Sequence, residues 1–246
     1  MKKENQQYKI LDIHTHILPG VDDGAKDMQE ALALARQARE NNTRGIVLTP
    51  HYRAPHKMDA DLLYKRFCLF RKALHKELPQ MSVYLGCEIR YQSGIPEMIR
   101  EHRLLPMYHS RYILLEFPST AFSTHILSAL RECIAAGIVP IVAHAERCDA
   151  FHHDPALTEQ VLTLGGLLQL NADSVMGKVS HRNKKFCHKV LEAKQVHFIA
   201  SDAHDSIRRP PLLRDCYTHV SEKYGEEYAQ KLFWDNPQAM VKNEEI

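Results

Sequence analysis

The amino-acid sequence predicts an α/β fold in which successive βα units form one barrel-shaped domain. Short apolar runs alternate with longer amphipathic runs from end to end, a pattern typical of strands and helices built around a parallel sheet. A length of 246 residues fits a single α/β barrel. No Pro/Gly/Ser-rich linker or charge block divides the chain. We therefore expect one domain over residues 9–246, preceded by an N-terminal extension of residues 1–8.

The predicted strands are short runs of mostly Val, Ile and Leu, a composition suited to burial on both faces of a parallel sheet. Seven such runs occur, at residues 9–13, 45–49, 82–87, 112–116, 138–143, 167–170 and 196–200. Seven successive βα units without a break favour a closed or nearly closed barrel over an open sheet.

The predicted helices lie between these runs. The first has the clearest pattern, because apolar residues recur at helical spacing from Met28 to Ala38, and Asp27 and Glu30 are placed like a capping box. Further helices are expected near residues 60–77, 124–136, 156–164, 183–194, 211–223 and 226–234. The last should end before Asn236 and Pro237, because a proline disfavours helical geometry at the residue that precedes it.

Composition excludes several classes of function. A net charge of +2 gives no strong overall field for nucleic acid or an anionic membrane. The longest apolar run, 134–143, is broken by Gly137 and Pro140 and is too short to span a bilayer. The first ten residues lack the apolar core of a secretory signal, so a cytoplasmic location is expected. The 6 cysteines form no C-x-x-C pair, which argues against a disulfide framework or a thiolate zinc site.

Histidines and carboxylates follow six of the seven predicted strands. In βα barrels the carboxyl ends of the strands meet on one rim, where catalytic sites are built. The residues in question are His14, His16, Asp22 or Asp23, His51, Glu88, Glu116, His144, Asp202 and His204. So many carboxylates converging without a cation would be energetically costly, so we predict a metal site there.

The ligand types indicate the chemistry. Imidazole and carboxylate without thiolate suit Zn, Fe or Mn better than Ca or Cu(I). The ligands exceed the needs of one ion, and two or three ions a few ångströms apart can lower the pKa of a bridging water and clamp an in-line phosphoryl displacement. We therefore expect hydrolysis of a phosphoester.

With these residues assembled, the chain resembles the polymerase and histidinol phosphatase (PHP) superfamily, whose opening motif is matched by Asp12-Ile13-His14-Thr15-His16. Within it, the sequence is similar to the manganese-dependent tyrosine-protein phosphatases of Gram-positive capsule and exopolysaccharide loci. The matching segments are HTHILPGVDDGAKDMQEAL, TPHYR, GCEIRY, LLEF, VAHAERC, ASDAHDSIRRPP and the terminal DNPQ.

The resemblance implies a distorted TIM-like (β/α)7 barrel with three Mn²⁺ ions, Fe or Zn being possible substitutes. It implies a first ion held by His14, His16, Glu88 and Asp202, a second by Glu88, Glu116 and His144, and a third by Asp23, His51 and His204. Asp22 is the alternative to Asp23. The family's phosphate-binding arginines correspond to Arg147 and Arg209.

The implied activity is hydrolysis of phosphotyrosine on a bacterial tyrosine autokinase that controls polysaccharide synthesis, with a metal-bridging hydroxide as the nucleophile. The segment from Arg53 to Asp59 departs most from the family pattern and is expected to bear on substrate choice.

Three alternative functions use some of the same residues or chemistry. A cysteine-dependent phosphatase needs Cys-x5-Arg, and none of the cysteines has an arginine six residues later. A small-molecule phosphatase of the histidinol-phosphatase type would use the same ligands with a different pocket. A non-catalytic metal-binding regulator of a kinase is disfavoured by the complete ligand set together with the two arginines.

Overall fold

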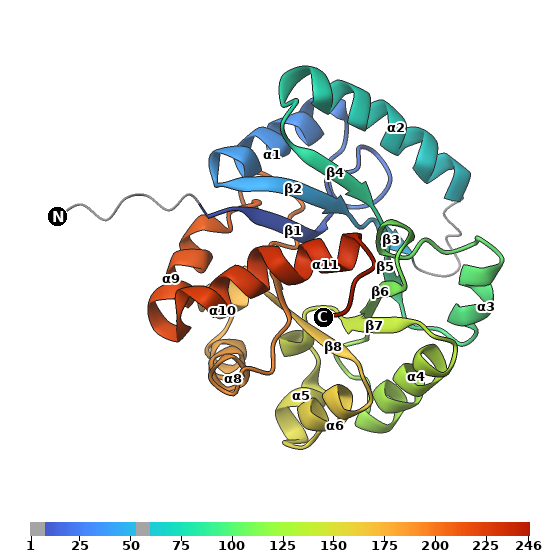
Figure 1. The fold of residues 1–246 in the computed structure, drawn as a ribbon, viewed down its shortest axis with the longest axis vertical. Helices are drawn as coiled ribbons and strands as arrows, with labels where there is room; N and C mark the ends of the chain where they lie inside the picture. Colours follow the sequence, from blue (N-terminus) through green and yellow to red (C-terminus); the bar gives the residue numbers. More distant parts are fainter. Residues whose placement is uncertain (1–7, 53–59) are drawn as a thin grey trace.

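A computed structural model describes residues 8–52 and 60–246 of the chain. Its strands all pair in parallel and curl into a barrel (Figure 1). They are β1 (Ile10–Thr15), β2 (Thr43–Leu48), β3 (His51–Tyr52), β4 (Ser82–Leu85), β5 (Glu88–Arg90), β6 (Tyr112–Glu116), β7 (Val139–Val142), β8 (Leu167–Asn171) and β9 (Phe198–Ala200). One sheet has the order β1-β2-β4 and the other β3-β5-β6-β7-β8-β9. The predicted barrel is confirmed.

Two of the predicted strand positions are interrupted where the two sheets meet. The predicted end of the strand at 82–87 is wrong, because the strand breaks after Leu85 and resumes as β5 at Glu88. Its neighbour breaks in step, between β2 and β3, so Leu48 pairs with Leu85 and His51 pairs with Glu88. Counting each broken strand once gives the seven predicted positions. The shared break brings His51 and Glu88 side by side on the rim.

The barrel closes between β9 and β1. Thr15 forms an isolated parallel bridge with Ala203, and the backbone N–H of Asp202 donates to the carbonyl of His14 over 2.9 Å. The buried carboxylate of Asp12 reinforces this seam by accepting from the backbone N–H and the hydroxyl of Ser201, at 3.1 and 2.5 Å. The seam fixes the ends of β1 and β9, which carry four of the predicted ligands.

Helices surround the barrel, as Figure 1 shows. The longer ones are α1 (Met28–Glu40), α2 (Ala60–Glu77), α4 (Ser123–Ala135), α8 (His181–Glu192) and α9 (Arg214–Tyr224). The shorter ones are α3 (Ile95–Arg100), α5 (Asp149–His153), α6 (Leu157–Thr163), α7 (Ala172–Val175), α10 (Glu226–Gln230) and α11 (Asn236–Val241). The predicted cap of α1 is present, because Oδ1 of Asp27 accepts from the backbone N–H of Glu30 over 2.9 Å.

Apolar side chains form two separate cores. One lies between the strands and the surrounding helices, and the other fills the barrel interior. Met240 and Val241 of α11 belong to the interior core together with Leu11, Ile13 and Phe198 from the strands. The end of the chain thus seals the barrel from one side, and α11 lies across the centre of the view in Figure 1.

The predicted end of the last helix is wrong. Helical structure continues from α10 through a π-helical turn, Lys231–Asp235, into α11. Pro237 stands in the first turn of α11, directly after the π-helical turn. The side-chain amide of Asn236 donates to the carbonyl of His197 over 2.9 Å and helps to fix this turn against the barrel.

Two predicted segments lie wholly or largely outside the described residues. They are the segment from Arg53 to Asp59 and the N-terminal extension, of which only Tyr8 is described, stacked on Tyr217 with ring centroids 3.9 Å apart. Within the described ranges, no helix combines the length and the apolar character needed to cross a membrane.

Candidate metal centre

The structure gathers the predicted ligands at the carboxyl ends of the strands. His14 and His16 come from the end of β1, His51 from β3 and Glu88 from β5. Glu116 ends β6, and the remaining ligands stand in the loops that follow β1, β7 and β9. Side chains that can hold an ion group there in three sets: His16, Asp23, His51 and His204; His14, His16 and Glu88; and His51, Glu88 and Glu116.

The innermost group is formed by two imidazoles and two carboxylates. Oε2 of Glu88 lies 3.4 Å from Nε2 of His14 and 3.4 Å from Nε2 of His16. Oδ1 of Asp202 lies at the same distance, 3.4 Å, from both nitrogens. All four side chains are buried. Four potential ligand atoms therefore face one point inside the rim.

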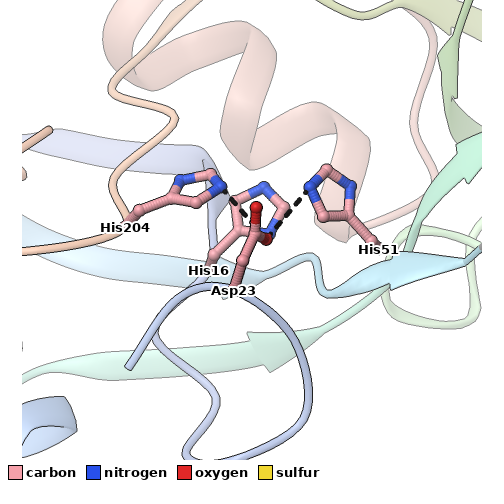
Figure 2. Close-up of side chains that lie close together, drawn as sticks. All are labelled: His16, Asp23, His51 and His204. Carbon is pink, nitrogen blue, oxygen red and sulfur yellow. Dashed lines mark ion pairs between the residues drawn. The ribbon is translucent and has the colours of Figure 1, made fainter. Parts of the chain in front are cut away.

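A second group lies toward the solvent, and Figure 2 shows its side chains converging. Oδ1 of Asp23 lies 3.3 Å from Nε2 of His51 and 3.6 Å from Nε2 of His204. The Asp23 side chain is 64% exposed, whereas those of His16 and His204 are buried. Asp23 thus closes this group from the solvent side.

Asp22, the alternative ligand, has a different position. Its Oδ2 accepts from Nδ1 of His16 over 2.8 Å and from the backbone N–H of His51 over 3.1 Å. Its Oδ1 accepts from the backbone N–H of Gly24 over 3.1 Å. Asp22 therefore holds the His16 ring with Nε2 turned toward the cluster, and Asp23 is the residue that faces the ion-binding groups.

Glu88 lies between the groups. Its Oε1 is 2.8 Å from Nε2 of His144, and its Oε2 is 2.7 Å from Nδ1 of His51. Glu116 lies within reach of the same point and is paired with Arg90 over 3.4 Å. A carboxylate with one oxygen toward each side has the geometry of a bridging ligand.

Electrostatics keep the buried carboxylates charged. Burial opposes ionisation of Glu88, but the charge of His14 and hydrogen bonds from His14, His144 and His16 hold its pKa well below the usual range. Burial likewise opposes protonation of His16, but hydrogen bonds with Asp202, Asp22 and Glu88 raise its pKa well above the usual value. Without an ion, the positive charge on the imidazole rings balances the negative charge of the buried carboxylates. A bound cation would take over this role.

The donor set fits a divalent ion of borderline hardness. His204 is the clearest case, because burial and the nearby His16 lower its pKa to about 4. Its Nε2 is buried and makes no hydrogen bond within the described part of the chain. A neutral imidazole nitrogen without a proton partner is the form that binds metal. None of the ion-binding sets among the described residues includes a thiolate, which suits Mn, Fe or Zn.

Backbone strain occurs at two of these positions. His144 has a φ of 32° and Asp202 a φ of 55°, in the left-handed region that residues with a Cβ rarely adopt. Residues held in this region cost free energy and persist where surrounding contacts enforce them, often at functional sites. Both turns redirect a side chain from the end of a strand toward the cluster.

Both predicted arginines contact the same ligand. Arg147 donates to Oδ2 of Asp202 over 2.9 Å, and Arg209 forms an ion pair with that same oxygen. Each side chain is about one-third exposed, at 35% and 33%. The two guanidinium groups therefore stand between the buried cluster and solvent, where an incoming anion would meet them.

Several residues at the site were missed from the sequence. Arg90 reaches Glu116, but a single arginine within a strand carries no distinctive pattern. Gln169 and Asn171 contact His14 and Asp202 through hydrogen bonds. Uncharged amides do not stand out in a search for titratable ligands, although their positions at the end of β8 were a usable signal.

Comparisons with known proteins find relatives that match almost the whole chain. The family model described as "Capsular polysaccharide synthesis, CpsB/CapC" matches residues 10–242. The tyrosine-protein phosphatase CpsB of Streptococcus agalactiae is 30% identical over 243 residues, covering 96% of this chain and 100% of its own. The tyrosine-protein phosphatase YwqE of Bacillus subtilis is 29% identical over 238 residues, covering 96% and 93%.

A solved structure gives the same result. A chain from the crystal structures of YwqE from Bacillus subtilis and CpsB from Streptococcus pneumoniae, described as unique metal-dependent tyrosine phosphatases, superposes with a TM-score of 0.90 at 28% identity, covering 96% of each chain. Since the family model spans the barrel from β1 through α11, the protein belongs to the CpsB/CapC family of capsular polysaccharide synthesis.

Proposed function

We propose that this protein is a metal-dependent protein-tyrosine phosphatase of capsular or exopolysaccharide synthesis. The observation that carries the proposal is the geometry around Asp202, whose Oδ1 faces two buried imidazoles while Oδ2 is held by Arg147 and Arg209. An ion-binding group and an anion-binding group thus share one carboxylate, an arrangement suited to hydrolysis of a phosphomonoester. The names of the relatives described above support the same activity.

Three Mn²⁺ ions are proposed, with Fe or Zn as substitutes. His14, His16, Glu88 and Asp202 would hold the first, Glu88, Glu116 and His144 the second, and Asp23, His51 and His204 the third. The short distances from Glu88 to His144 and to His51 support its role as the shared ligand. When bound, such ions lower the pKa of a shared water and supply the nucleophile.

The side chains of this protein would orient the phosphoryl group. A guanidinium presents a planar fork of N–H donors that matches two phosphate oxygens and stabilises charge during transfer. Arg147 and Arg209 would exchange their contact with Asp202 for contacts with the phosphoryl oxygens. Because no cysteine has an arginine six residues later, and burial raises the pKa of Cys87 to about 12, we expect no covalent intermediate on sulfur.

The proposed substrate is phosphotyrosine on a bacterial tyrosine autokinase in the cytoplasm. The family description, capsular polysaccharide synthesis, supports a place in that process. The proposed catalytic unit is the single domain of residues 9–246. No helix within the described ranges is long and apolar enough to cross a membrane.

A substrate comparison tests the proposal. Mn²⁺-loaded protein is given a phosphotyrosine peptide, the matching phosphoserine peptide and histidinol phosphate, and phosphate release is followed. We expect kcat/KM to be highest for phosphotyrosine. Preferred turnover of histidinol phosphate would point to a small-molecule phosphatase, and tight metal binding without turnover of any substrate would point to a non-catalytic regulator of a kinase. Either result would contradict the proposal.

A further inference from the structure

Strand β8 has a role in the metal centre that its sequence conceals. It occupies the one predicted strand position that delivers no histidine or carboxylate to the rim. It ends instead in two buried amides, Gln169 and Asn171, with exposed fractions of 0% and 1%. A fully buried amide must find hydrogen-bond partners, because an unpaired one loses its bonds to water without replacement. The partners of both amides belong to the metal centre.

Hydrogen bonds link the two amides into a chain between two predicted ligands. Oε1 of Gln169 lies 3.2 Å from Nδ1 of His14. Nε2 of Gln169 donates to Oδ1 of Asn171 over 2.8 Å, and Nδ2 of Asn171 donates to Oδ2 of Asp202 over 2.7 Å. His14 and Asp202 are therefore joined by an unbroken path of buried hydrogen bonds.

One backbone group fixes the direction of this chain. The N–H of His144 points at Oε1 of Gln169 over 2.8 Å, and a backbone N–H can only donate. The atom facing it must be the amide oxygen, so the Gln169 nitrogen faces Asn171, and the Asn171 nitrogen faces Asp202. Every N–H in the chain then points from His14 toward Asp202.

This direction leaves one ligand atom free at each end. His14 donates from Nδ1, so the neutral His14 ring carries its lone pair on Nε2, which faces the cluster 3.4 Å from Oε2 of Glu88. At the other end Asn171 takes Oδ2 of Asp202, and Oδ1 remains facing the imidazoles. Partners of this kind set the tautomer and orientation of metal ligands and often change affinity 10- to 100-fold.

We propose that Gln169 and Asn171 are positioning residues that hold His14 and Asp202 ready for the ion. The inference rests on the proposed metal-dependent function and deepens it. Arg147 and Arg209 also hold Oδ2 of Asp202, but a bound phosphoryl group would draw them away. Asn171 then stays as the partner that keeps Oδ1 of Asp202 turned toward the ion throughout the reaction.

The test uses Gln169→Leu, Asn171→Leu and the double variant of the full-length protein. Mn²⁺ dissociation constants are measured by competition with a chelating dye, and thermal unfolding is followed with and without Mn²⁺. We expect each single variant to raise the dissociation constant about 10- to 100-fold. The rise in Tm produced by Mn²⁺ should shrink, and kcat should recover to within a few-fold at saturating Mn²⁺.

The double variant separates a chain from two independent contacts. If the two amides act independently, the increases in the Mn²⁺ dissociation constant should multiply in the double variant. If they form one chain, the double variant should raise the dissociation constant about as much as the more severe single variant. Asn236→Leu is the matched control, since that amide also donates to the barrel but at its other end. It should lower the Tm of metal-free protein without changing Mn²⁺ affinity. If the leucine variants do not fold, Gln169→Ala and Asn171→Ser take their place.

Mn²⁺ affinities within twofold of the parental value in the folded single variants would overturn the proposal, as would fully multiplicative effects in the double variant. If the parental protein binds Mn²⁺ and hydrolyses phosphotyrosine while these variants bind it equally well, only the positioning role fails. If the parental protein binds no divalent ion, the proposed function and the positioning role both fail.

Discussion

Arg147 donates a hydrogen bond to Oδ2 of Asp202 over 2.9 Å, so a predicted phosphate-binding side chain contacts a predicted metal ligand. Oδ2 also receives Arg209 and the amide of Asn171. The arrangement makes the two arginines separable from metal binding, because Asp202 keeps a partner when either arginine is removed.

Arg147→Ala and Arg209→Ala should therefore lower kcat/KM with little change in bound metal. Loss of one preorganised donor to a developing anion costs roughly 100- to 1,000-fold in rate. Lysine should rescue poorly because it lacks the guanidinium fork. The exposed Arg208 is the control, and Arg208→Ala should stay close to the parental rate. Near-parental kcat/KM in both Arg147→Ala and Arg209→Ala would refute the phosphate-binding role.

Thiol modification should spare the activity. Burial raises the pKa of Cys87 and of Cys133 to about 12, so neither thiolate forms near neutral pH. Of the six free cysteines only Cys68 is not buried. We expect iodoacetamide-treated protein and a Cys87→Ser variant to keep phosphatase activity within a few-fold. A trapped phosphocysteine, or loss of turnover in Cys87→Ser with full metal content, would require a different nucleophile.

The loop that carries Asp22 and Asp23 should not tolerate a side chain at Gly24. A Cβ at this position would lie 1.8 Å from the carbonyl oxygen of His16, a clash with backbone that cannot move freely. Gly24→Ala should therefore displace the loop and weaken Mn²⁺ binding by on the order of tenfold or more. Gly94→Ala is the control, because nothing lies within 4 Å of a Cβ there, although its positive φ costs some stability. Equal Mn²⁺ affinities in Gly24→Ala and Gly94→Ala would contradict this role of the loop.

Stability should fall in acid through His197, which lies far from the metal centre. Burial lowers its pKa to about 4, and its Nδ1 accepts from the backbone N–H of Leu168 over 3.3 Å, which requires the neutral ring. Between about pH 4 and 6.5 the unfolded chain binds a proton that the folded chain does not, so the free energy of unfolding rises with pH.

Urea unfolding of chelated protein at several pH values measures this effect. His197→Gln keeps an acceptor but cannot titrate, so its slope should be shallower by up to about 1.4 kcal/mol per pH unit in this window. Parallel slopes for the parental protein and the variant would exclude His197 as the source.

Much of the fold was predictable because it depends on local patterns. The strand at 112–116 and the helix at 60–77 match the structure residue for residue. The break after Leu85 was not predictable, since it depends on the neighbouring strand breaking in step. The end of the last helix was wrong because packing of Met240 and Val241 into the barrel outweighs the local tendency at Asn236 and Pro237.

The candidate site divides in the same way. Residues with a titratable side chain at a strand end, such as His14 and Asp202, could be found from strand position alone. The roles of Asp22 and Asp23 could not, because neighbouring loop residues differ only in which way the backbone turns them. Gln169 and Asn171 escaped prediction because their position at a strand end does not show which groups an uncharged amide contacts.

Parallel measurement of bound metal and phosphotyrosine turnover tests the central claim most directly. Chelated protein is titrated with Mn²⁺, and metal content and phosphate release are recorded at each step, together with His16→Ala and Glu88→Ala at full Mn²⁺. The account predicts no turnover in metal-free protein, a rise that follows bound Mn²⁺, and joint loss of metal and activity in both variants. Full turnover in protein verified to be free of metal would contradict it.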